Sequence, residues 1–106
     1  MQTDGGPVHF SAELWASESD VAWCFVTVPV ELSDTIEFIV AGRGSRRGFG
    51  SVKVEVTVGS TSWRTSLFPD KGRGAFVLPM KRAVRDAEAL RVGEDVAVAL
   101  RLVETA

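Results

Sequence analysis

The chain has one histidine, His9, and one cysteine, Cys24, two residue types that commonly act together as base and nucleophile. Alternating apolar and polar residues predict β-strands at 8–16 and 22–28 around these two side chains. Pairing the strands about a turn near Ser19 points His9 outward and Cys24 inward, so the two would not touch. A single imidazole also cannot build an ordinary zinc site. We therefore expect no catalytic residues, no metal and no cofactor, and a protein that is not an enzyme.

The segment GRGSRRGFG, residues 42–50, places Arg43, Arg46 and Arg47 among glycines. A guanidinium group is a planar bidentate donor that suits phosphate oxygens. The segment matches neither GxxxxGK[ST] nor a GxGxxG that follows a strand and opens a helix. It follows a predicted helix and precedes a predicted strand, so it offers no helix N-terminus to an anion. The segment is therefore not one of the usual nucleotide-binding loops. We interpret it as a basic loop that can conform to a partner.

Two further basic groups could join this loop: one in a predicted turn at 69–74 and one on a face of a predicted helix at 79–90. A phosphate-bearing ligand becomes a candidate partner if the fold gathers all three groups. The alternative is a solvated basic surface that pairs with acidic residues, within one molecule or between two. The candidate anion-binding set is Arg43, Arg46, Arg47, Lys71, Arg73, Lys81, Arg82 and Arg85.

The net charge of −2 conceals a strong asymmetry along the chain. Residues 1–42 contain seven acidic side chains and no lysine or arginine, whereas residues 43–91 contain eleven basic and four acidic side chains. Such polarity can create an electrostatic face. The acidic isoelectric point of about 5.3 nevertheless argues against general affinity for nucleic acid.

A length of 106 residues fits one domain. We expect a disordered N-terminal tail at 1–7 and a single domain at 8–106, because Gly5, Gly6 and Pro7 oppose regular structure. The N-terminus lacks the basic and apolar regions of a signal peptide, and no apolar run approaches the roughly 20 residues of a membrane span. The lone cysteine fits a reducing compartment. These features predict a cytoplasmic protein without a membrane partner.

The first two predicted strands form a hairpin in which Leu14 lies opposite Cys24 on the inner face. The same register places Trp15 opposite Trp23 on the outer face, as an aromatic cross-strand pair. Outward tryptophans could stack on bases or sugars. The alternative is that they pack under a helix or against a second subunit.

The segment SVKVEVTVGSTSWRTSLF predicts a second hairpin about the two-residue turn Gly59–Ser60. Pairing about this turn puts Val56 opposite Trp63 inside the fold. Outside, it puts Glu55 opposite Arg64 as a cross-strand ion pair.

Apolar residues at helical spacing predict helices at 30–40 and 79–90, the second with a buried stripe of Met80, Ala83, Val84 and Ala87. A short strand at 75–78 and a last strand from 95 complete the order ββα–ββ–βαβ. Six short strands with two helices favour a small closed or partly closed barrel. We predict a mainly β fold, a six-stranded pseudobarrel whose open ends are capped by two short helices.

A family resemblance rests on Gly48–Phe49–Gly50, the run WRTSLFP at 63–69, Leu78–Pro79 with Lys81 and Arg85, and Gly93 with Asp95. On these residues the chain resembles a small bacterial domain-of-unknown-function family sometimes found beside YdeI/OmpD-associated segments. The resemblance implies a double-split β-barrel, the architecture of the AbrB-like DNA-binding superfamily. It implies no activity.

Together these features predict a non-catalytic small β-barrel that binds an anionic, phosphate-bearing partner or nucleic acid through its basic loops. One alternative is a protein-interaction or self-association module, a homo-oligomer driven by the charged halves or by the tryptophan face. A second alternative is an AbrB-like DNA-binding protein, although fold alone does not fix function.

Overall fold

The computed structural model describes residues 6–42 and 50–103. These residues form one antiparallel sheet in the strand order β1-β7-β4-β5-β6-β3-β2. In chain order the elements are β1 (Val8–Glu13), β2 (Trp15–Ala16), β3 (Cys24–Thr27), α1 (Val30–Gly42), β4 (Val52–Val58), β5 (Thr61–Asp70), β6 (Ala75–Pro79), α2 (Arg82–Ala87) and β7 (Asp95–Leu102).

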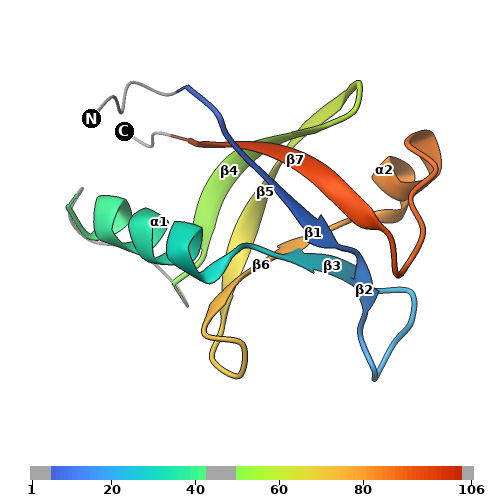
Figure 1. Cartoon of the computed structure of the whole chain (residues 1–106), viewed down its shortest axis with the longest axis horizontal. Coiled ribbons are helices and arrows are strands. Elements are labelled where there is room, and N and C mark those ends of the chain that lie inside the picture. Colours follow the sequence, from blue (N-terminus) through green and yellow to red (C-terminus); the bar gives the residue numbers. More distant parts are fainter. Residues whose placement is uncertain (1–5, 43–49, 104–106) are drawn as a thin grey trace.

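The sheet is nearly closed because β1 and β2 lie at its two ends and are joined through Leu14 (Figure 1). The N–H of Leu14 donates to the carbonyl of Glu94 at 2.9 Å, and its carbonyl accepts from the N–H of Gly93 at 2.8 Å. Residues 8–16 therefore pair with β7 along their first part and with β3 along their last. The mainly β, barrel-like fold with two helices is as predicted. The predicted six strands are seven in the described residues, because the first predicted strand is divided at Leu14.

Apolar side chains that alternate with polar ones along the strands fill the interior of the barrel. Successive side chains of a strand point to opposite faces, so every second residue of the central strands enters the core. The inward residues of β4 and β7 are at most 6% exposed: Val52, Val54, Val56, Val58, Val96, Val98 and Leu100. Leu67 of β5 and Leu78 of β6 meet them in the same core.

The β4–β5 hairpin has the predicted register, with Val56 opposite Trp63 and Glu55 opposite Arg64. Gly59 adopts the positive φ of 59° that the tight turn requires, a conformation that glycine reaches without steric cost. The Glu55 carboxylate forms its ion pair with Arg101 of β7, at 3.9 Å. This partner lies on the other side of β4, because β7 flanks that strand.

The first hairpin differs from the prediction by two residues. Trp15 lies opposite Phe25 and Ala16 opposite Cys24, so the predicted Trp15–Trp23 and Leu14–Cys24 pairs are wrong. The connecting loop is longer than predicted, since the N–H of Trp23 donates to the carbonyl of Asp20 at 2.9 Å within it. A shift by two residues leaves each side chain on its predicted face.

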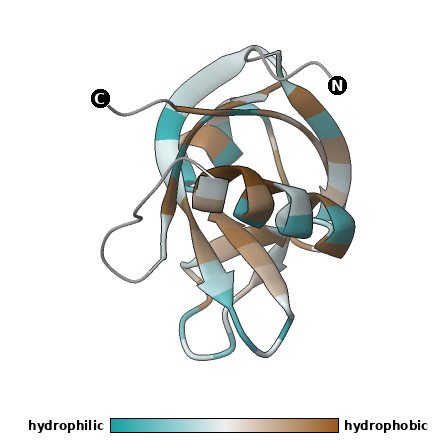
Figure 2. Ribbon diagram, turned by 90° about the vertical axis from the view of Figure 1, so that its left-hand side faces the viewer, coloured by the Kyte–Doolittle hydropathy of each residue, from teal (hydrophilic) through white to brown (hydrophobic). Residues whose placement is uncertain are grey.

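The two helices lie at opposite ends of the longest axis of the molecule (Figure 1). Helix α1 lies across one end of the barrel (Figure 2), where Ile36 is 2% exposed and Leu32 and Val40 pack against the core. Helix α2 is shorter than predicted. Its residue Val84 is buried, but the helix ends at Ala87 and the chain turns away at Ala89, whose φ is 53°.

The predicted buried stripe of the second helix is therefore only half right. Met80 and Val84 are buried, whereas Ala83 and Ala87 are exposed. A helix of under two turns has room for only one buried position on its inner side. Neither helix of the described ranges is long and apolar enough to cross a membrane.

Candidate functional site

The histidine and the cysteine lie on separate strands and point in the predicted directions. His9 is exposed on the outer side of β1, whereas Cys24 is 4% exposed in the core. The Cys24 thiol donates weakly to the carbonyl of Val21 at 3.8 Å. Residues 6–42 and 50–103 contain no group of three histidine, cysteine, aspartate or glutamate side chains that could hold a metal ion.

The predicted anion-binding set falls into two described groups and one that lies outside the described residues. Arg43, Arg46 and Arg47 belong to the last group. Lys71 and Arg73 lie on the turn that joins β5 to β6, which we call the β5–β6 turn. Lys81, Arg82 and Arg85 lie at or in α2, well apart from that turn (Figure 1).

Two of the predicted arginines already have carboxylate partners. Arg73 Nε lies 3.5 Å from Asp70 Oδ2, and Arg82 Nε lies 3.6 Å from Asp86 Oδ2. The second pair is highly exposed, so its contribution to stability is small. Both pairs favour the alternative that the basic surface is neutralised within the molecule.

Arg85 is bound to the backbone rather than directed into solvent. Its Nε donates to the carbonyl of Met80 at 2.9 Å, and its Nη2 donates to the carbonyl of Ala22 at 3.0 Å. Ala22 precedes Trp23 in the β2–β3 loop, so Arg85 attaches α2 to this loop. The Arg85 guanidinium therefore holds a structural position.

Large aromatic side chains cover the outer face of β2, β3, β6 and the end of β5. We call this face the aromatic wall and define it by Trp15, Trp23, Phe25, Phe68, Val77 and Arg73. The strand registers place Phe68 opposite Val77, Val77 opposite Thr27 and Trp15 opposite Phe25, and Trp23 lies two residues before Phe25 in the chain. Trp23 is 63% exposed and Phe68 is 44% exposed, whereas Val77, which lies between Phe68 and Thr27, is only 6% exposed. The wall is therefore a packed apolar surface that faces solvent.

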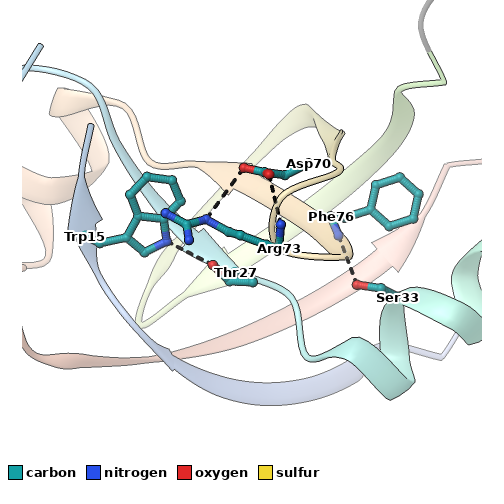
Figure 3. Close-up of polar contacts among 6 residues, drawn as sticks. All are labelled: Trp15, Thr27, Ser33, Asp70, Arg73 and Phe76. Atoms are coloured by element: carbon teal, nitrogen blue, oxygen red, sulfur yellow. Dashed lines mark hydrogen bonds and ion pairs between the residues drawn. The ribbon is translucent and has the colours of Figure 1, made fainter. Parts of the chain in front are cut away.

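Trp15 lies at the centre of this wall and has three specific contacts. Its ring stacks on Phe25 with centroids 5.0 Å apart and an interplanar angle of 28°. The guanidinium carbon of Arg73 lies 3.8 Å from the Trp15 ring centroid. The indole Nε1 donates to Thr27 Oγ1 at 2.9 Å (Figure 3). A cation over a tryptophan face is attracted by the ring quadrupole, so this stack has a fixed geometry.

Asp70 positions Arg73 over the tryptophan. Its Oδ1 accepts the backbone N–H of Arg73 at 3.1 Å, while its Oδ2 forms the ion pair with the Arg73 side chain (Figure 3). The carbonyl of Asp70 also accepts from the N–H of Gly74 at 2.9 Å. One carboxylate thus fixes both the backbone of the β5–β6 turn and the direction of the guanidinium.

Ser33 connects α1 to the same part of the sheet. Its hydroxyl donates to the carbonyl of Val28 at 3.2 Å. The same oxygen accepts the N–H of Phe76 at 3.1 Å (Figure 3). The Ser33 side chain continues the β3–β6 ladder past the end of β3, which explains why this polar residue is only 4% exposed. A hollow of about 220 Å³ lies between α1 and the β5–β6 turn, and Asp34 and Lys71 are among its lining residues.

A second hollow, of about 450 Å³, lies on the outer face of β1, β7 and β4. Ala97 and Ala99 form its floor because their short side chains leave space between the flanking strands. His9 and Thr57 are among the residues that line it. The hollow is shaped by small residues, and among the described residues that line it the exposed His9 is the one titratable side chain.

Sequence reasoning identified part of the aromatic wall. It placed Trp15 and Trp23 on the outer face, which the structure confirms, but it missed Phe25, Phe68 and the stacking of Arg73. Phe25 and Phe68 occupy outward positions of predicted strands, so the period-two pattern could have revealed them. The exposure of Trp23 also shows that neither helix packs over it.

No curated protein matches this chain. A family profile described as "Domain of unknown function (DUF1905)" matches residues 10–100. The match runs from β1 to β7 and includes both helices and every residue of the aromatic wall. The chain therefore belongs to the DUF1905 family of domains of unknown function.

Proposed function

We propose that this domain is a non-catalytic protein-interaction module that docks an acidic, partly apolar protein surface on its aromatic wall. The observation that carries the proposal is the pair of exposed aromatics, Trp23 and Phe68, beside the ordered Phe25–Trp15–Arg73 stack. Tryptophan and arginine are enriched among the residues that contribute most to protein–protein binding. Contiguous exposed apolar surface on a soluble domain commonly marks such a site.

The central side chains of the wall are held in place by contacts within the domain. Trp15 is fixed by Thr27 and Phe25, and Arg73 by Asp70. A partner that binds to already ordered side chains loses less conformational entropy than one that must order them. This rigidity suits a binding surface. The core does not require it, because the core lies on the other face of the sheet.

The charge of the β5–β6 turn indicates the chemistry of the partner. Lys71 and Arg73 outnumber the single carboxylate of Asp70, so the turn carries a net positive charge at the edge of the wall. Complementary charge accelerates association and selects among partners. A partner with carboxylates beside apolar side chains satisfies both parts of the surface.

The non-catalytic part of the proposal rests on the separation of His9, exposed on β1, from Cys24, buried on β3. We also propose a bacterial cytoplasmic location. A lone, buried thiol is compatible with a reducing compartment.

Binding of an anion through the basic loops is a second candidate function. Lys71 and Lys81 are exposed and form no ion pair with the other described residues, which favours it. Chromatography on heparin and on random duplex DNA with a salt gradient tests it, and the duplex arm also tests AbrB-like DNA binding in a double-split barrel. Strong retention that falls with salt supports this candidate, and passage through both columns contradicts it.

Photo-crosslinking in cells that express the domain tests the proposed function directly. The photoreactive residue p-benzoylphenylalanine is placed at position 23 or 68 in the aromatic wall. Position 92 is the matched control, since Val92 is 56% exposed but lies outside the wall. We expect protein adducts from positions 23 and 68 and few from position 92. An equal yield at the three positions, or none, contradicts the proposal.

A further inference from the structure

We infer that the protein docked on the aromatic wall is a second copy of this chain, which presents the outer side of its own α1. This inference rests on the proposed function and names its partner. We call the outer side of α1 the α1 stripe and define it by Val30, Glu31, Asp34 and Phe38. The assembly is a two-fold dimer in which the α1 stripe of each copy packs on the aromatic wall of the other.

The α1 stripe has the composition that the aromatic wall requires. Residues spaced by four along a helix lie on one side, so Val30, Asp34 and Phe38 form a continuous row. Phe38 is 81% exposed and Val30 is 49% exposed, while Ile36 on the other side of the helix is buried in the barrel. The stripe therefore combines carboxylates with apolar side chains directed into solvent.

The charges of the two surfaces are complementary. Glu31 and Asp34 give the α1 stripe a negative charge, whereas Lys71 and Arg73 against Asp70 give the edge of the wall a positive charge. The same polarity appears in the whole chain, whose first 42 residues contain no lysine or arginine. Opposite charges that meet at an interface fix its register and steer the encounter of the two copies.

The two surfaces also border each other on one molecule. Asp34 of the stripe and Lys71 of the β5–β6 turn line the same hollow of about 220 Å³. One two-fold axis near this hollow can therefore bring each stripe to the wall of the other copy. Such an interface is isologous and closes after two copies. Stable interfaces bury about 1,200–2,000 Å² in total, and a two-fold dimer uses both patches of each chain.

Charge reversal with mixing tests this dimer in purified full-length protein. Asp34→Lys and Lys71→Glu are made separately and studied by sedimentation velocity up to about 1 mM, so that dissociation constants up to the millimolar range are detected. We expect the wild type to dimerise and each variant alone to associate at least about tenfold more weakly.

An equimolar mixture of the two variants should regain dimerisation. The lysine introduced into one chain then meets the glutamate introduced into the other, so this contact has opposite charges again, and the second contact of the two-fold pair is native. The exposed pair Arg91→Glu and Asp95→Lys is the matched control, which we expect to leave association unchanged.

Three results would overturn the inference: a wild type that stays monomeric, variants that dimerise normally, or a mixture that is no better than its components. Species larger than a dimer would show a head-to-tail contact and would contradict the two-fold arrangement. The crosslinking experiment separates this failure from that of the proposed function. Adducts of twice the chain mass support the second copy, whereas adducts only to a different protein retain the proposed function and reject self-association.

Discussion

The two walls of the barrel share one core but have opposite outer surfaces. The aromatic wall presents Trp23 and Phe68 to solvent around a stacked centre. The outer face of β1, β7 and β4, which we call the small-residue wall, presents Ala97 and Ala99 and is hollowed by about 450 Å³. Both inner faces are filled by buried valine and leucine side chains.

The difference between the two outer surfaces shows which outward residues the fold needs in order to close. A barrel of this size closes over small outward residues on one side, so outward aromatics are not required for closure. Exposed tryptophan and phenylalanine carry a risk of non-specific association on a soluble protein. Their concentration on one wall therefore points to binding on that wall, and single substitutions can show how independent the two walls are.

The largest loss of stability is expected from a substitution at Leu14, the residue that joins the two walls. Leu14 is fully buried, and its backbone pairs with Glu94 and Gly93 at the point where the sheet closes. Leu14→Ala should lower the free energy of unfolding by about 2–5 kcal/mol, through lost burial and the cavity left behind. Urea denaturation measures this. Val8→Ala on the same segment is the control, because Val8 is 39% exposed. Equal, small losses for both variants would show that closure does not depend on Leu14.

The next largest loss of stability is expected from a substitution at Ser33, and it should be confined to the aromatic wall. Ser33→Ala leaves the N–H of Phe76 and the carbonyl of Val28 without the hydroxyl that bridges them. We expect a loss of about 1–3 kcal/mol, the cost of unsatisfied buried polar groups. Thr35→Ala is the matched control, since the Thr35 hydroxyl donates to the carbonyl of Glu31 at an exposed position. If hydrogen exchange accelerates equally in β7 and β6, the walls do not open independently.

Alanine substitutions at two glycines, Gly59 and Gly74, compare the stability of the turns in the two walls. Gly59 and Gly74 have similar positive φ values, 59° and 64°, so alanine should cost about 1 kcal/mol at each through backbone strain. At Gly59 the added methyl group also meets the Glu88 carboxylate, which accepts hydrogen bonds from Ser60 and Thr61. Thermal unfolding should therefore show Gly59→Ala as the less stable variant. A larger loss at Gly74, where the methyl group enters open space, would contradict this.

The smallest effect is expected for the stacked arginine. Arg73→Gln removes the cation from Trp15 and the ion pair with Asp70, but the Arg73 side chain is 43% exposed. A double-mutant cycle with Trp15→Leu should give a coupling of about 0.5–1 kcal/mol. Arg64→Gln, at an exposed position of β5, should show no coupling with Trp15→Leu. A coupling of zero for Arg73 would mean that the stack does not order the wall.

Sequence alone predicted those features that local chemistry determines. The two-residue turn at Gly59–Ser60 leaves one register for the β4–β5 hairpin, and that register was predicted correctly. The turn around Asp20 is longer, so two registers with identical faces compete and the pattern could not choose between them. The division of the first strand at Leu14 depends on hydrogen bonds to Gly93 and Glu94, which are distant in sequence. The alternation of apolar and polar residues within a strand does not reveal such partners.

The candidate site shows the same limit. Alternation was sufficient to place Trp15 and Trp23 outside, but the position of Arg73 over Trp15 joins residues distant in sequence. Arg85 was predicted to bind an anion from a basic helix face, yet its guanidinium donates to the carbonyl of Ala22 in another loop. The arginines at 43, 46 and 47 lie outside the described residues, so their part in an anion site stays a prediction.

The indole N–H signals of the three tryptophans give the most direct test that the aromatic wall docks a second chain. Trp15 and Trp23 belong to the wall, whereas Trp63 packs against the core and is an internal control. Two-dimensional NMR of the ¹⁵N-labelled domain is recorded as unlabelled domain is added. We predict that the Trp23 signal, and to a lesser extent that of Trp15, shifts or broadens with concentration while Trp63 stays constant. Three unchanged signals, or equal changes in all three, would contradict the account.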